Sequence, residues 1–110
     1  MLSEAISSEI VDGMRNVFGG QLLSVVLYGS VARGDDTPES DVDIAVFLRE
    51  PMESGKLDQM VSVFAALGLK YDRVFSPMDI EQAMFDKWVN ILSYYQNIRK
   101  EGIVLWKAAA

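Results

Sequence analysis

The sequence predicts a single small α/β domain, classed more finely as α+β, with helices covering one or both faces of one sheet. Amphipathic stretches alternate with short apolar runs, a pattern typical of helices that pack on buried strands. The chain has 110 residues and half of them are apolar, which suits one domain with one layered core. We therefore take residues 1–107 as the domain and set 108–110 aside as a tail or cloning scar.

The first half of the chain predicts one helix followed by two strands. Residues 3–18 carry apolar side chains three and four positions apart, and Ser3 can cap the start of this helix. Residues 22–28 form a continuous apolar run, typical of a buried strand. A polar, turn-rich segment then leads to a second predicted strand at residues 41–48.

The middle of the chain predicts a helix and a short third strand. Apolar residues recur at helical spacing from Leu57 to Leu67, and Gly68 is expected to end that helix. Residues 70–75 are expected to form the strand that follows.

The last third predicts a helix and a short terminal element. Ser76 can act as an N-cap, Pro77 suits the first helical position, and Asp79 can complete a capping box, so a helix is expected from here to about Lys100. A break is expected near Asp86. Residues 103–106 are expected to add a final strand or a packed tail.

The composition narrows the chemistry that the domain can perform. Cysteine and histidine are absent, which removes thiol nucleophiles and the commonest base and transition-metal ligand. Any metal must be held by oxygen, as Mg²⁺, Mn²⁺ and Ca²⁺ are. The net charge of −6 argues against direct nucleic-acid binding but permits a small anionic ligand that arrives with a divalent cation. Neither a signal peptide nor a membrane span is expected, so the location is expected to be cytoplasmic.

Two acidic residues in the second strand form a candidate metal site. Side chains alternate along a strand, so Asp41 and Asp43 should point to the same face with Cα atoms roughly 6.5–7 Å apart. Two carboxylates at this separation can hold one cation or flank two. The alternative is a solvated acidic turn. Because aspartate is depleted in strands, two on one face of an apolar strand favour the metal site.

A glycine and a serine directly after the first strand form a candidate phosphate cradle. Gly29 lets the backbone turn sharply or approach a ligand, and the N–H groups after it can point at a phosphate. The Ser30 hydroxyl adds a donor. Alone, this pair is more often an ordinary turn, and no Gly-Lys-Ser/Thr follows to make a P-loop. The Gly29-Ser30 pair indicates a phosphate site only because the aspartate pair follows it at a fixed distance in the sequence.

The combined pattern matches a known family. Gly29-Ser30, ten further residues, and then Asp41-Val-Asp43 resemble the signature of the DNA polymerase β-type nucleotidyltransferase superfamily. The fuller string, with Gly-Ser-Val-Ala-Arg-Gly and Ser-Asp-Val-Asp, resembles its MNT branch of minimal nucleotidyltransferases. The resemblance implies a nucleotidyltransferase palm domain with a mixed sheet and a third metal-binding carboxylate on a neighbouring strand.

The resemblance also implies the chemistry. AMP would pass from ATP to an acceptor hydroxyl at a site with two Mg²⁺ ions, or Mn²⁺, held by Asp41 and Asp43. Asp72 is the candidate for the third carboxylate and the general base, because it is an acid in a strand-like run. The alternative is that Asp72 is a surface acid paired with Lys70 or Arg73.

Phosphate binding is implied for four residues. The backbone after Gly29 and the hydroxyl of Ser30 would hold the β- and γ-phosphates, and Ser40 and Arg33 are assigned to the same group. For Arg33 the alternative stays open that it only neutralises the acids of the loop, Asp35 among them.

The resemblance suggests a partner as well. MNT proteins often pair with HEPN-domain toxins, in which the MNT antitoxin adenylylates a tyrosine. The chain is a bare palm, so the acceptor pocket is expected from a HEPN-type protein or a second copy. The alternatives are an aminoglycoside-like small-molecule acceptor and a catalytically silent antitoxin. The last helix carries more apolar residues than one packing face needs, and the surplus can form such an interface. The alternative is that all of them belong to the core or to a homodimer contact. These residues are Trp88, Ile91, Leu92, Tyr94, Tyr95 and Ile98.

Overall fold

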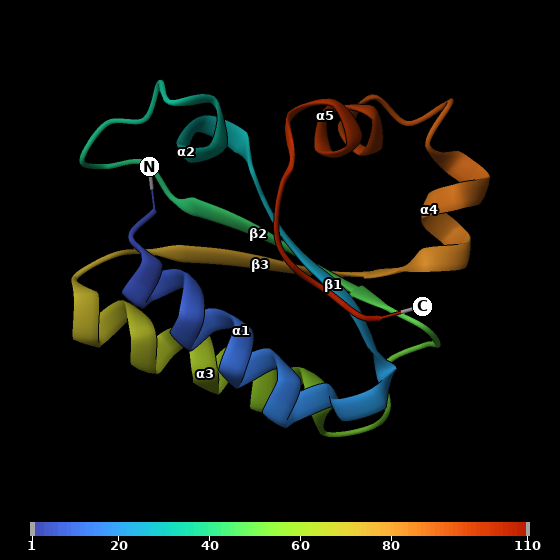
Figure 1. Ribbon diagram of the computed structural model, residues 1–110, viewed down its shortest axis with the longest axis horizontal. Helices are drawn as coiled ribbons and strands as arrows, with labels where there is room; N and C mark the ends of the chain where they lie inside the picture. Colours follow the sequence, from blue (N-terminus) through green and yellow to red (C-terminus); the bar gives the residue numbers. More distant parts are fainter. Residues whose placement is uncertain (1, 110) are drawn as a thin grey trace.

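The computed structural model describes residues 2–109, which form one four-stranded sheet and the helices that cover it (Figure 1). In chain order the elements are α1 (Glu4–Phe18), the 3₁₀ turn η1 (Gly19–Gln21), β1 (Leu22–Tyr28), α2 (Gly29–Arg33), β2 (Val42–Leu48), α3 (Lys56–Tyr71), β3 (Phe75–Glu81), α4 (Gln82–Trp88), α5 (Ser93–Glu101) and β4 (Ile103–Lys107). The strand order is β3-β2-β1-β4. β1 is antiparallel to β2 and β4, whereas β2 and β3 are parallel, so the predicted mixed sheet is confirmed.

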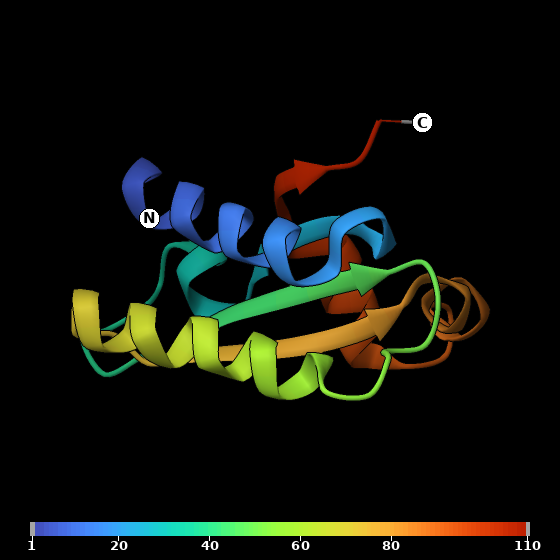
Figure 2. The same ribbon diagram turned by 90° about the horizontal axis from the view of Figure 1, so that it is seen from below.

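Helices cover both faces of the sheet. In Figure 1, α1 and α3 lie below the sheet, and α4 and α5 lie above it. Figure 2 shows α1 and α3 side by side along one face. The alternation along β2 explains this arrangement, because Val42, Ile44 and Val46 join one core while Ala45 and Phe47 join the other.

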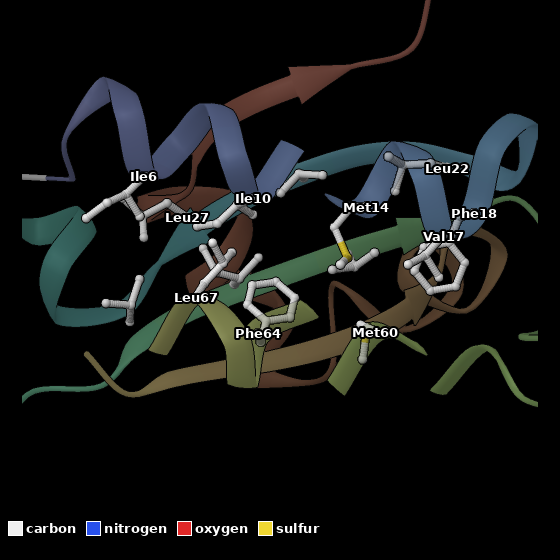
Figure 3. Packing of buried hydrophobic residues seen from close by; sticks show 14 of the residues in the cluster. Ile6, Ile10, Met14, Val17, Phe18, Leu22, Leu27, Met60, Phe64 and Leu67 are labelled. Carbon is white, nitrogen blue, oxygen red and sulfur yellow. The ribbon is translucent and has the colours of Figure 1, made fainter. Parts of the chain in front are cut away.

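The larger core lies between α1, α3 and the sheet. In Figure 3 the apolar side chains of α1, among them Ile10 and Met14, point towards Met60 and Phe64 of α3 and Leu27 of β1. Ile10 and Met14 are completely buried. The helical stripe predicted for residues 3–18 is therefore the packing face of α1, and the Ser3 hydroxyl caps this helix by accepting from the Ile6 N–H at 3.2 Å.

The end of α3 differs from the prediction. The helix continues through Gly68 to Tyr71, and the chain turns at Asp72 with φ 51° and ψ 49°. Asp tolerates this left-handed conformation better than most residues, which lets it end a helix as glycine does. The strand expected at residues 70–75 is therefore wrong, and Asp72 lies at a helix terminus.

The next segment is a strand where a helix start was predicted. β3 contains Ser76 and Pro77 and pairs with β2 along its whole length. β3 is at the edge of the sheet, where a proline without an N–H is tolerated. Ser76, Pro77 and Asp79 match the local pattern of a helix start, but pairing with the apolar strand β2 outweighs this local preference.

The final elements follow the prediction more closely. The break in the last helical region falls between α4 and α5, a few residues after Asp86. β4 is the predicted final strand, and the N–H of Ala108 extends its pairing by donating to the Leu23 carbonyl at 2.8 Å. Ala110, part of the supposed tail, lies outside the described residues. Within residues 2–109, no helix is both long and apolar enough to span a membrane.

Candidate functional site

The turn from β1 into α2 builds the first half of the site. β1 runs directly into α2 at Gly29, whose φ of +76° lies in the left-handed region. Tyr28 precedes the helix and provides no side-chain cap for the first N–H groups of α2. Val31 is buried and holds α2 against the larger core. These N–H groups and the Ser30 hydroxyl can therefore receive an anion.

The second half of the site comes from β2 and touches the first. Asp43 pairs with Tyr28 across the antiparallel strands, which places its side chain beside the β1–α2 turn. A Cβ atom on Gly29 would overlap the Asp43 carboxylate. The Asp43 carboxylate thus occupies the space that a side chain at position 29 would need. The sheet therefore brings the predicted phosphate cradle and the predicted metal ligand into contact.

Asp41 and Asp43 form a pair of neighbouring negative charges. Asp41 lies immediately before β2, is exposed, and accepts a hydrogen bond at its Oδ2 from the Ser76 hydroxyl at 3.0 Å. The pKa of Asp43 is raised above its ordinary value by partial burial and by the charge of Asp41, while Arg33 lowers it. Two mutually repelling carboxylates fit one divalent cation with oxygen ligands, which would keep both ionised.

The raised pKa of Asp43 makes metal-free stability depend on pH. Ionisation of Asp43 is less favourable in the folded protein than in the unfolded chain. The free energy of unfolding therefore falls as the pH rises from the ordinary pKa of 3.8 through the pKa of the folded state. We expect Asp43→Asn to melt at a higher temperature than the wild type at pH 7 in EDTA, and the gap to shrink as the pH falls through this window. Thermal melts across pH measure it, and a gap that grows on acidification would contradict it.

The structure does not bring Asp72 to the aspartate pair. Within residues 2–109, no three Asp or Glu side chains are grouped so that they could hold one ion. Asp72 instead lies at the rim of an open apolar hollow of about 650 Å³ between α3 and β3, which Leu69 and Val74 also line. The lining of this hollow is mostly apolar, with Asp72 and Arg73 as its charged members.

Arg33 and Ser40 are engaged within the protein. The Arg33 guanidinium contacts Asp35 at 3.2 Å and Glu101 at 3.0 Å, which joins α2 to α5. The alternative in which Arg33 neutralises loop acids thus has geometric support for Asp35. The Ser40 hydroxyl accepts from the Thr37 N–H at 2.9 Å and so closes a turn in the loop before Asp41.

Sequence reasoning gave no role in the site to three residues that lie around it, Tyr28, Ser76 and Tyr94. Partial burial, then the charges of Asp43 and Tyr94, raise the pKa of Tyr28 to about 12, so its phenol stays neutral. The Tyr94 hydroxyl contacts the sulfur of Met78 above the same face of the sheet. Tyr28 could have been noticed because it directly precedes Gly29. Ser76 could not, because its approach to Asp41 depends on the strand register.

Comparisons with known proteins agree with this arrangement. The profile of the nucleotidyltransferase domain family matches residues 8–102. The Methanocaldococcus jannaschii protein named "Putative protein adenylyltransferase MJ0604" is 31% identical over 106 residues, which cover 96% of this chain and 100% of the relative. A second protein of that organism, "Putative protein adenylyltransferase MJ0141", is 27% identical over 90 residues, covering 82% of this chain and 91% of its own.

Solved structures share the fold at lower identity. A chain of a toxin–antitoxin complex with AMP-PNP has a TM-score of 0.66 and 19% identity, covering 93% of this chain and 73% of that chain. A chain of the complex of a tri-AMPylated Shewanella oneidensis HEPN toxin with its MNT antitoxin has a TM-score of 0.63 and 16% identity, covering 97% and 74%. Given the profile match over most of its length and the 31% identical relative, this chain is a nucleotidyltransferase and belongs to the nucleotidyltransferase domain family.

Proposed function

We propose that this chain transfers AMP from ATP to a hydroxyl of a partner protein, a tyrosine of a HEPN-type toxin, in a reaction that requires Mg²⁺. The observation that carries the proposal is the contact between the β1–α2 turn and Asp43, because the groups proposed to bind phosphate then lie beside a carboxylate proposed to bind the cation. A nucleoside triphosphate with its metal ion needs both kinds of group, donors for its phosphates and oxygen ligands for its cation. The names of the M. jannaschii relatives support protein adenylylation, and the AMP-PNP complex supports ATP.

The reaction joins the acceptor to the α-phosphate. The acceptor oxygen attacks the α-phosphorus, the bond from that phosphorus to the oxygen bridging to the β-phosphate breaks, pyrophosphate leaves, and the hydroxyl proton passes to solvent. The start of α2 and the Ser30 hydroxyl bind and orient the phosphates. Asp41 and Asp43 would hold Mg²⁺, which would neutralise charge on the phosphate oxygens. Because Asp72 lies at the end of α3, we assign it no role as a metal ligand or as the general base.

The acceptor is proposed to come from another chain. The described residues form one sheet with covering helices and no further domain to enclose an acceptor. Near the site, the segment linking α4 to α5 leaves Ile91 68% exposed and Leu92 40% exposed. The hydroxyl-bearing Tyr94 beside them is also largely exposed. This surface is the proposed contact for the partner, and the likeness of the fold to a chain of a HEPN toxin–MNT antitoxin complex supports a partner of that kind.

Labelled ATP tests the proposal directly. We expect incubation with Mg²⁺, ATP labelled at the α-phosphate and a HEPN-type partner protein to label that protein on tyrosine. ATP labelled at the γ-phosphate should give no labelled protein, because that phosphate leaves in pyrophosphate. Label found only on an added aminoglycoside would instead support a small-molecule acceptor. Neutralisation of the partner with no label anywhere would support an antitoxin that acts by binding alone.

A further inference from the structure

Ser76 occupies a special position in the sheet. In the parallel register of β2 and β3, Ser76 is the direct neighbour of Asp43, so both side chains rise from the same face at the same level. The Ser76 hydroxyl also donates to Asp41 at 3.0 Å. One side chain on the neighbouring strand therefore lies next to both members of the aspartate pair, and it is uncharged.

We propose that Ser76 fills, with a neutral hydroxyl, the position from which a third carboxylate would reach the metal site, so that the free chain binds one divalent cation and not two. The inference rests on the proposed function, since it takes Asp41 and Asp43 as the metal ligands. It concerns how many ions those ligands can hold before the nucleotide arrives.

The other acids nearby cannot replace the missing carboxylate. Asp72 is held at the end of α3, before β3 begins. Asp79 lies three positions after Ser76 on the same strand and pairs with Val46, whose side chain faces the larger core. Because side chains alternate along a strand, Asp79 leaves the sheet on the opposite side from Ser76. Within residues 2–109, neither acid is grouped with Asp41 and Asp43 so that the three could hold one ion.

Charge balance then limits the number of ions. Two carboxylates balance one divalent cation. A second ion close to the first would meet an uncompensated repulsion. The negative charge that admits a second ion must therefore arrive with the triphosphate. The nucleotide thus completes the metal site as well as serving as the substrate.

A titration of the nucleotide-free chain with Mn²⁺, followed by the electron paramagnetic resonance signal of free Mn²⁺, tests this. We expect one ion per wild-type chain at up to about 1 mM Mn²⁺. Ser76→Asp should bind two ions, or bind the first about tenfold more tightly, because the number of charged ligands sets divalent-cation affinity. Ser76→Asn, which adds a side chain of the same size without charge, should still bind one, and so should Asp72→Asn.

Several outcomes overturn the inference. These are two ions or none in the wild type, a Ser76→Asp variant that behaves as the wild type does, or a loss of Mn²⁺ in Asp72→Asn. Thermal melts supply a second measurement, since Ser76→Asp should be destabilised in EDTA by like charges and gain more than the wild type when Mn²⁺ is added. One bound ion and the Ser76→Asp gain, without transfer of label to any acceptor, would refute the proposed function and leave the inference standing.

Discussion

Replacing Asp41 and Asp43 together with asparagine is expected to lower the rate of AMP transfer by about a thousandfold or more. The substitutions keep the size of both side chains and remove both charges that would hold the cation beside the phosphates. The fold should survive, because Asp41 is exposed and the pKa of Asp43 is already raised by partial burial and by Asp41. In EDTA the variant should be as stable as the wild type or slightly more stable.

Transfer of α-labelled phosphate and thermal melting in EDTA measure these two effects. The matched control is Asp36→Asn with Glu39→Gln, which removes two acids from the same loop without touching the aspartate pair. It should retain most of the activity. If the double Asp41 and Asp43 variant still transfers label at near the wild-type rate, these aspartates are not the metal ligands. If it transfers nothing but still neutralises a partner fully, occlusion explains the neutralisation.

The second large effect is expected from Gly29→Ala. An alanine there must adopt a φ of +76°, and its Cβ would overlap the Asp43 carboxylate. We expect a loss of about 1–3 kcal/mol in the free energy of unfolding, from the left-handed backbone and the displaced side chain. Activity should fall by about a hundredfold or more, because the carboxylate and the α2 N–H groups are moved apart from their shared position.

Gly55→Ala is the control that separates the effect of backbone strain from an effect on the site. Gly55 has a φ of +83°, and an added Cβ there meets no atom within 4 Å. This variant should lose about 1–2 kcal/mol of stability from the backbone alone and keep its transfer rate. Chemical denaturation and the labelling assay compare the two variants. If both lose stability and neither loses activity, the contact between position 29 and Asp43 has no bearing on catalysis.

The first half of the fold could be predicted because its signals are local and agree with one another. α1 has a cap, a stripe and a terminating glycine, and β1 is a continuous apolar run. For β2, simple alternation predicted that Asp43 lies on the face opposite Val42, Ile44 and Val46, and the structure adds a second, smaller core on the Asp43 face. The aspartate pair and the Gly29 turn were predicted as a site from local signals too, because an acid in an apolar strand is unfavourable unless something binds it.

The region from residue 68 to 81 could not be predicted, since distant pairing decides it. Gly68 is a plausible helix end and Ser76-Pro77 a plausible helix start, but α3 runs past the first and β3 takes in the second. The ladder with β2 determines both outcomes. The same ladder places Ser76 beside the aspartate pair, which no sequence pattern disclosed, whereas Asp72, predicted as the third carboxylate, lies at the end of α3.

The contact between position 29 and Asp43 also has an evolutionary consequence. Where one residue occupies the volume that another vacates, neither can be replaced alone without loss. Homologous sequences should therefore show the two positions substituted together or not at all, with glycine relaxed to larger residues only in copies that have lost the aspartate. Such copies would be the lineages that kept the fold for binding after abandoning transfer.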